Sequence, residues 1–268
     1  MKPIGFIGAG NMAEAIISGL IKKGLITARE LMIFDIKQDR MDHLRSSLGV
    51  EVASSALDLT RSRDIVILAV KPDQVLPLLK DIKSALAKKV VISIAAGITL
   101  KSMLEVLGEK AKVIRVMPNT PSLVLEGAAV IAASPSCTGE DRRIARDIFA
   151  SVGVCLEMDE KFLNAVTALS GSGPAFCFLF LEALSDGAVK AGLPRDVALK
   201  LAAATMRGAA SMVLDLGKHP GQLKDMVTSP SGTTIEGIAV LESKGFRAAV
   251  IDAISAAYNR AEVLSGKS

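Results

Sequence analysis

Short apolar runs alternate with longer amphipathic segments through the first half of the chain. Continuous runs such as DIVILAV (64–70) are typical of strands buried on both faces of a parallel sheet. Strands alternating with segments of helical length predict βαβ units and a doubly wound α/β fold. The predicted strands are 4–7, 31–35, 64–70, 90–95, 112–117 and 128–132, and the predicted helices are 12–23, 37–48, 73–86, 100–107 and 139–151.

The pattern changes near residues 157–161. From residue 162 onward no segment predicts a strand, and long helical patterns are broken by Gly and Pro in LPRD, KHPGQ and TSPSG. The alanine-rich segment 195–216 suits close packing between helices. We therefore predict a Rossmann-type doubly wound domain at 1–160 and an all-helical domain at 161–268.

Composition narrows the class of protein. Of 268 residues, 50% are hydrophobic and 22% are charged, which favours a folded chain with a substantial core. The longest apolar runs, 65–70 and 175–181, are far shorter than the roughly 20 residues that span a bilayer. The start, MKPIGFIGAG, resembles a strand rather than a signal peptide. We expect a cytoplasmic protein without a membrane partner.

Charge and rare residue types exclude further classes of site. The net charge of +4 is small, and with no Trp and one Tyr the chain lacks stacking platforms for nucleic acid. Three cysteines and two histidines, without metal-ligand spacing, predict neither a disulfide framework nor a metal site.

A glycine-rich turn follows the first predicted strand. IGFIGAGNMAEAI contains the spacing G-x-G-x-x-A between a strand and a helix. The glycines permit a tight turn and close approach of the backbone, and the helix N-terminus offers free N–H groups to a pyrophosphate. This context predicts a dinucleotide site. The candidate cofactor contacts are Ile7, Gly8, Gly10, Asn11 and Met12.

Asp35 ends the second predicted strand, where an acidic side chain can accept hydrogen bonds from the ribose of NAD(H). It could instead cap the helix that begins at Lys37. Lys37 and Arg40 lie close by and could supply the positive charge that favours a 2′-phosphate. These residues leave the choice of cofactor open, and we expect NADP(H), with NAD(H) as the alternative.

Three further loops leave the carboxyl ends of predicted strands, where open α/β sheets bind ligands. They are AVKPDQV (69–75), AAGIT (95–99) and VMPNTPS (116–122). Pro72 and Gly97 could merely end their strands, and Asn119 could bond only its own turn. The candidate cofactor contacts here, together with Ser55, are Ala69, Val70, Lys71, Pro72, Ala96, Gly97 and Asn119.

The helical half contains a loop with unusual hydrogen-bonding capacity. DMVTSPSGTTIEG (225–237) carries five hydroxyl side chains between two helical patterns. Hydroxyls and N–H groups at a helix start can bind a carboxylate, but the same residues could form an ordinary helix cap. His219, before Pro220, is predicted to cap or pack rather than to catalyse.

These motifs together resemble the pyrroline-5-carboxylate reductase family. The residues that carry the resemblance are GFIGAGNMA, LAVKP, AAGI, RVMPNTP, ALSGSGPAF, AGLPR and HPGQLKDMVTSPSGTT, in that order along nearly the whole chain. The resemblance implies reduction of L-1-pyrroline-5-carboxylate to L-proline by NAD(P)H, the last step of proline biosynthesis. It also implies that the helical domain binds the substrate and forms an intertwined dimer, with rings of dimers in some family members.

The resemblance assigns residues to the substrate as well. The hydroxyl-rich loop would hold the carboxylate, Ser172 would lie beside the nicotinamide, and Thr234 would serve the imine nitrogen in a positional role. The family usually has Gly where this chain has Ser231, and a positive φ there would strain Ser by about 1 kcal/mol. The candidate substrate contacts are Ser172, Ser229, Ser231, Gly232, Thr233 and Thr234.

Two other functions compete. A β-hydroxyacid-dehydrogenase-like oxidoreductase would need a proton donor among the helices, and Lys190, Lys200 and Lys218 are available. A non-catalytic NAD(P)-sensing dimer would have no use for a carboxylate-binding loop. TSPSGTT argues against this second alternative.

Overall fold

The computed structural model describes residues 2–266 and divides into two compact units. The first contains the chain up to Ser172 together with the residues from Ala257 onward, and the second is Gly173–Ala256. The sequence places its boundary earlier, between residues 160 and 161, where the strand pattern stops. The first unit extends further because Leu163 and Ala168 are fully buried, and Leu163 packs in the core that covers one face of the sheet.

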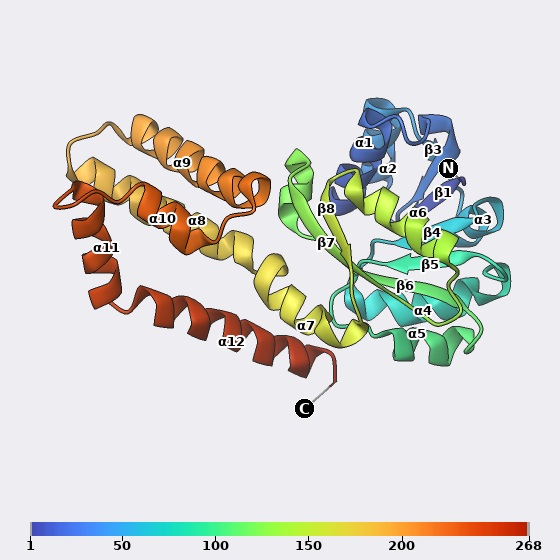
Figure 1. Ribbon diagram of the computed structural model, residues 1–268. Coiled ribbons are helices and arrows are strands. Elements are labelled where there is room, and N and C mark those ends of the chain that lie inside the picture. The colour runs from blue at the N-terminus through green and yellow to red at the C-terminus, as the bar shows by residue number, and fades with distance from the viewer. Residues whose placement is uncertain (1, 267–268) are drawn as a thin grey trace. The chain divides into compact units, whose positions relative to one another are not determined.

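The first unit is built on an eight-stranded sheet with the order β3-β2-β1-β4-β5-β6-β7-β8 (Figure 1). Neighbouring strands are parallel except for the antiparallel pair β6–β7. The strands are β1 (Ile4–Ile7), β2 (Leu31–Phe34), β3 (Glu51–Val52), β4 (Ile65–Leu68), β5 (Val90–Ser93), β6 (Lys112–Met117), β7 (Gly127–Ala133) and β8 (Gly153–Glu157).

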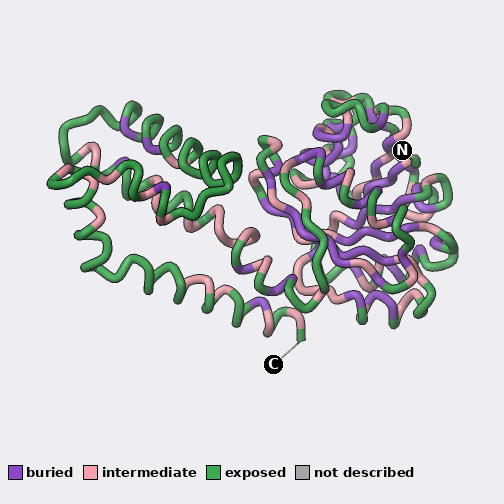
Figure 2. The backbone as a smooth tube through the Cα atoms, viewed as in Figure 1, coloured by how far each residue is buried: buried purple, intermediate pink, exposed green. Residues whose placement is uncertain are grey.

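Helices cover both faces of this sheet (Figures 1 and 2). One apolar core joins the sheet to α1, α2 and α6, and a second joins the other face to α3, α4 and α5. Strands such as β4, IVIL, are buried throughout because both faces are covered. The helices of this unit are α1 (Asn11–Lys22), α2 (Gln38–Leu48), α3 (Ala56–Ser62), α4 (Pro72–Ile82), α5 (Leu100–Leu107), α6 (Gly139–Ala150) and α7 (Leu163–Val166).

The structure confirms the α/β fold class, and the predicted bounds of α5 and β6 are correct. The sequence misses β3, α3 and β8. β3 has only two residues, and most of β8 is exposed, so neither shows the pattern of a buried strand. The expected parallel direction is wrong at β7. Its connection to β6 contains only the 3-10 helix Thr120–Val124, too short for a crossover of a dozen residues or more.

The strand register brings several loops to one edge of the sheet. Ile7 at the end of β1 pairs with Phe34 of β2 and with Leu68 of β4, and Leu68 pairs with Ser93 of β5. Four parallel strands therefore end at one level. The loops that follow them therefore leave the sheet at the same edge.

The helical run Glu160–Lys190 is not regular. A π turn, Thr167–Gly171, separates α7 from α8 (Gly173–Lys190). The predicted helix start near Pro174 is therefore the start of α8 inside a longer helical run.

The regular elements of the second unit are all helices, as predicted, and most of its residues are exposed in the single chain (Figure 2). Glu160–Lys190 and Arg195–Leu216 are long and apolar enough to cross a membrane by length and composition alone, which the short apolar runs did not predict. Besides α8, the helices here are α9 (Arg195–Leu216), α10 (Pro220–Met226), α11 (Thr233–Ser243) and α12 (Phe246–Leu264), whose last turns belong to the first unit.

Candidate active site

The turn after β1 requires glycine at Gly8. Its φ is +102°, and a Cβ there would lie 2.5 Å from the carbonyl oxygen of Ala69. The N–H of Gly8 also donates to the carbonyl of Phe34 at 2.8 Å. The turn is thus pressed between the ends of β2 and β4, and only a residue without a side chain fits.

Gly10 has a different reason to be glycine. It is the N-cap of α1, and no atom lies within 4 Å of the position that a Cβ would occupy. The space leaves the N-terminus of α1, with Asn11 and Met12 in its first turn, open to a bound group. Buried Ile7 ends β1 just before the turn. These residues fit a pyrophosphate held by backbone N–H groups.

Asp35 joins the end of β2 to this turn. Its Oδ2 accepts from the N–H of Ala9 at 2.6 Å, and its Oδ1 accepts from the N–H of Lys37 at 2.9 Å. The carboxylate therefore lies beside the glycine-rich turn, as a ribose contact requires, and also forms the turn that leads into α2. The N-cap of α2 is Lys37, so the prediction that Asp35 itself caps this helix is wrong, and the ribose contact stays a prediction.

Arg40 is folded onto the same turn. Its Nε donates to the carbonyl of Ala9 at 2.8 Å, and its Nη2 pairs with Glu14 at 2.7 Å. The hydrogen bond from Arg40 lowers the pKa of Glu14, against a smaller raising effect of burial, and His43 adds to the lowering. The guanidinium is thus already engaged, whereas Lys37 is exposed. The sequence identified Arg40 but missed its partner Glu14.

The loop after β4 lies against β1. The N–H of Ala69 donates to the carbonyl of Ile7 at 2.8 Å, and Val70 follows it. Lys71 is the N-cap of α4 and Pro72 its first residue, so α4 presents a second helix N-terminus at this edge. Ser55, by contrast, caps α3, since its Oγ accepts from the N–H of Asp58 at 3.0 Å.

The loop after β5 contacts the last turn of α12. Gly97 has a φ of +78°, and a Cβ there would lie 3.0 Å from the carbonyl oxygen of Leu264. The same turn is tied to α7, because Nδ2 of Asn164 donates to Oγ of Ser265 at 2.8 Å and to Glu262. The loop that contains Ala96 and Gly97 therefore packs against residues near the C-terminal end of the chain.

Asn119 lies after β6 and is buried. Its Nδ2 donates to the carbonyl of Ser170 at 3.1 Å, and its Oδ1 accepts from the N–H of Ala128 at 2.8 Å. Ser170 belongs to the π turn, two residues before Ser172. The N–H of Ser172 donates to the carbonyl of Thr167 at 2.9 Å, and its hydroxyl approaches the same oxygen at 3.3 Å.

The structure shows two further features near these loops that the sequence did not predict. Ile36 follows Asp35 and is 82% exposed, an apolar surface suited to the face of a nucleotide base. The signal was a lone Ile in the otherwise polar stretch DIKQDR. Glu160 accepts from the N–H of Leu100 at 2.7 Å and pairs with buried Arg115 at 3.1 Å, so it fixes the start of α5.

The hydroxyl-rich loop precedes α11 in the second unit. Gly232 is the N-cap of α11, and Thr233 and Thr234 begin the helix. A Cβ on Gly232 would lie 2.2 Å from Oγ of Ser229, so a side chain here would require that hydroxyl to rotate away. Ser231 has a φ of +56°, so the strain considered for a serine at this position applies. The loop carries three exposed hydroxyl residues, Ser229, Ser231 and Thr233, and two half-buried ones, Thr228 and Thr234.

The three lysines considered as proton donors for the alternative reaction are not held in a site of this kind. Lys190, Lys200 and Lys218 are exposed on their helices or loop. His219 caps α10, as predicted, because its Nδ1 accepts from the N–H of Gly221 at 3.1 Å.

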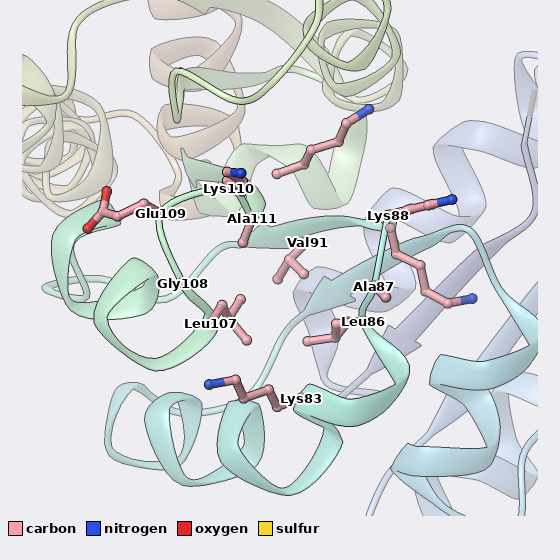
Figure 3. A pocket seen from close by; sticks show the side chains of 12 residues that line it. Lys83, Leu86, Ala87, Lys88, Val91, Leu107, Gly108, Glu109, Lys110 and Ala111 are labelled. Atoms are coloured by element: carbon pink, nitrogen blue, oxygen red, sulfur yellow. The ribbon is translucent and has the colours of Figure 1, made fainter.

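A cavity of about 810 Å³ lies at the opposite edge of the sheet, between the turns that precede β5 and β6 (Figure 3). Its floor is apolar, with Leu86, Val91 and Leu107, and lysines line its rim. The labelled side chains of Lys83 and Lys88 point in different directions instead of converging (Figure 3). The candidate site therefore lies at the carboxyl edge rather than here.

Comparisons with known proteins agree with this geometry. Residues 3–97 match the family model described as NADP oxidoreductase coenzyme F420-dependent, and residues 160–264 match the model of pyrroline-5-carboxylate reductase dimerisation.

Full-length relatives are similar over almost every residue. The pyrroline-5-carboxylate reductase of Methanosarcina acetivorans is 46% identical over 99% of both chains, and that of Escherichia coli is 44% identical over 98% of both. Among solved structures, a pyrroline-5-carboxylate reductase from Coxiella burnetii superposes with a TM-score of 0.94, at 37% identity over 98% of both chains. The Plasmodium falciparum pyrroline carboxylate reductase with NADP bound gives 0.88, at 34% identity over 98% of both. The chain belongs to the pyrroline-5-carboxylate reductase family.

Proposed function

We propose that this chain reduces L-1-pyrroline-5-carboxylate to L-proline, with the nucleotide at the carboxyl edge of the sheet and the substrate carboxylate at the N-terminus of α11. The observation that carries the proposal is the similarity to reductases over both of these segments at once. A family member that had lost the reaction would be free to lose one of the two segments.

The nucleotide half of the site is assigned to the strand-end loops. NAD(P)H supplies the hydride for the reaction. Gly8 forms the tight turn, and Gly10 leaves room for the pyrophosphate at the start of α1. Asp35, Lys37 and the exposed Ile36 would meet the adenosine end, while the loops of Lys71 and Gly97 face the nicotinamide end.

The substrate half is assigned to the loop before α11. The first N–H groups of the helix, with the hydroxyls of Ser229, Ser231 and Thr233, would hold the carboxylate. No guanidinium is needed, because the helix N-terminus carries a partial positive charge. Thr234 would place its hydroxyl at the ring nitrogen.

Catalysis then depends mainly on alignment. A protonated imine is already electrophilic, so holding its carbon against the nicotinamide can supply several kcal/mol, out of the roughly 7–11 kcal/mol available from alignment in favourable cases. A threonine hydroxyl is a weak general acid, so Thr234 acts by position and by hydrogen bonding rather than as the proton reservoir.

The chain self-associates through its helical unit, where the dimerisation model matches. This explains why apolar side chains are exposed on its helices in the single chain. Among them are Phe178, Leu179, Leu199, Leu214, Val240 and Ile251. We propose that a second copy covers these faces rather than a membrane or nucleic acid, that dimers assemble further into a ring, and that the protein works in the cytoplasm. Light scattering of the purified protein measures the assembly.

The test of the reaction is the initial rate of NADPH and of NADH oxidation, each with and without pyrroline-5-carboxylate. Oxidation that depends on the substrate is the expected result. If the folded protein binds a nucleotide but does not reduce the substrate, the proposal is contradicted. The non-catalytic NAD(P)-sensing dimer would then be favoured. The melting temperature with nucleotide, with and without L-proline, then shows whether the imino-acid site exists at all.

A further inference from the structure

The Asn119 side chain is a candidate cofactor contact by sequence, yet its polar atoms face the protein. Asn119 is only 9% exposed, and its hydrogen bonds go to Ser170 and Ala128. The orientation of the amide is fixed by chemistry, because the N–H of Ala128 needs an acceptor and the carbonyl of Ser170 needs a donor. Both Oδ1 and Nδ2 of Asn119 are therefore engaged in hydrogen bonds within the protein.

The carbonyl of Ser170 needs that donor because of Pro174. In a regular helix this oxygen would accept the N–H four residues later, but residue 174 is proline and has no N–H. The chain forms a π turn here, in which the N–H of Ser172 reaches back to Thr167 at 2.9 Å. Nδ2 of Asn119 replaces the missing helical donor at 3.1 Å.

The same loop touches the π turn at a second point. A Cβ on Gly171 would lie 2.7 Å from Cε of Met117, so the Met117 side chain packs directly on the glycine backbone. Met117 and Asn119 flank Pro118 at the end of β6. The loop after β6 thus holds the π turn by one hydrogen bond and one close packing contact.

We propose that Asn119 is a positioning residue, whose amide stabilises the π turn at the carbonyl left free by Pro174 and so sets the position of Ser172 in the active site. This inference rests on the proposed function, which places Ser172 beside the nicotinamide and the substrate. The side chain acts through the helix backbone and does not touch the nucleotide.

The first test is Asn119→Asp, which keeps the acceptor for Ala128 and replaces the donor facing Ser170 with an oxygen. We expect kcat to fall by about tenfold or more, because small misplacements of a reacting pair are costly, with KM for pyrroline-5-carboxylate raised. The Kd of NADPH, measured by fluorescence titration, should change less than about twofold, since a lost nucleotide hydrogen bond would raise it by more. Asn259→Asp, an exposed position on α12, is the matched control. A raised Kd with unchanged kcat would assign Asn119 to the nucleotide and overturn the proposal.

The second test is a double-mutant cycle with Pro174→Ala, which returns an N–H to residue 174. Melting temperatures of folded variants at one protein concentration are compared. We expect Asn119→Ala to lower the melting temperature less in the Pro174→Ala background than in the wild type, because the Ser170 carbonyl can then find a helical donor. Equal losses in both backgrounds would contradict the proposal. This cycle needs no turnover, so its outcome is independent of whether the proposed reaction is correct.

Discussion

The carboxylate of Asp35 accepts a hydrogen bond from the N–H of Ala9 at 2.6 Å, so the end of β2 is fastened to the glycine-rich turn after β1. A single negative charge therefore lies next to the backbone that would hold the pyrophosphate. The same position is where nucleotide-binding sheets distinguish a ribose hydroxyl from a 2′-phosphate. The two cationic neighbours are not equivalent, because Arg40 is paired with Glu14 and Lys37 is exposed.

Asp35→Ser should shift the preference toward NADPH. Removing the carboxylate removes its repulsion of a 2′-phosphate and leaves Lys37 to attract it. The ratio of kcat/KM for NADPH to that for NADH is expected to rise by about tenfold, the size of one lost unfavourable charge contact. Asp39→Ser makes the same charge change in the first turn of α2 and serves as the control. An unchanged ratio would remove Asp35 from the ribose site.

Thr234→Ala should slow turnover without abolishing it. If the hydroxyl only positions and hydrogen-bonds the substrate, kcat falls by no more than roughly a few hundredfold. Thr234→Ser should recover most of the loss, because it keeps the hydroxyl at the second residue of α11. Single-turnover rates of the two variants give this comparison. Complete loss in the alanine variant, with an intact fold, would show that Thr234 is an obligatory proton donor.

Ser231→Gly should leave the protein as stable or slightly more stable. Relief of the positive φ favours glycine by about 1 kcal/mol, and the greater freedom of glycine in the unfolded chain offsets about 0.4–1 kcal/mol of this. Ser231→Val should be less stable than the wild type, since a β-branched residue fits this backbone region worst. Denaturant titrations at one protein concentration measure the order. A valine variant as stable as the wild type would mean that the assembled protein does not hold this φ.

Asp141→Asn should produce a defect that depends on pH. Asp141 is almost fully buried and pairs with Lys112 at 2.8 Å. Burial raises its pKa, but the hydrogen bonds from Lys112 and Thr138 outweigh burial and leave the pKa lowered. Its charge therefore stabilises the fold at neutral pH, and this contribution disappears as the pH falls through the lowered pKa. We expect a loss of about 1–3 kcal/mol at pH 7 that shrinks below about pH 4.

Denaturant titrations of the same variant from pH 7 to pH 3 check this dependence. Glu140→Gln, an exposed neighbour whose ion pair with Lys2 spans 3.9 Å, should cost under about 1 kcal/mol at any pH. A gap between wild type and Asp141→Asn that stays constant on acidification would assign the effect to shape rather than to charge.

The parts of the site that depend on local chemistry could be read from the sequence. A glycine-rich turn between a strand and a helix has few other uses, and the tight turn is confirmed at Gly8. At Gly10 the position of a Cβ is empty, and the approach of a ligand there stays a prediction. At Ser231 the sequence raised a positive φ only as a condition, and the structure shows it at +56°. In each case the requirement lies within a few residues.

The parts of the site that depend on partners far away in the sequence could not be predicted from it. The place of Asn119 is set by a carbonyl 51 residues later in the chain and by a proline beyond it. The role of Glu160 could not be predicted either, because its partners, Leu100 and Arg115, are 60 and 45 residues away in the sequence. The antiparallel direction of β7 is an intermediate case. The composition of β7 does not indicate its direction, but the connection from β6 is too short for a parallel arrangement.

The last turn of α12 has a practical consequence for dissecting the protein. Through Leu264 it packs on the loop of Gly97, and through Ser265 it bonds Asn164, so the nucleotide-binding unit is discontinuous in sequence. A gene fragment that stops at Ser172 would encode this unit without one of its own pieces. The Asn164 amide would lose its partners, and nucleotide affinities measured on the fragment would understate those of the whole chain. A synthetic peptide covering the residues from Ala257 onward should complement it in trans.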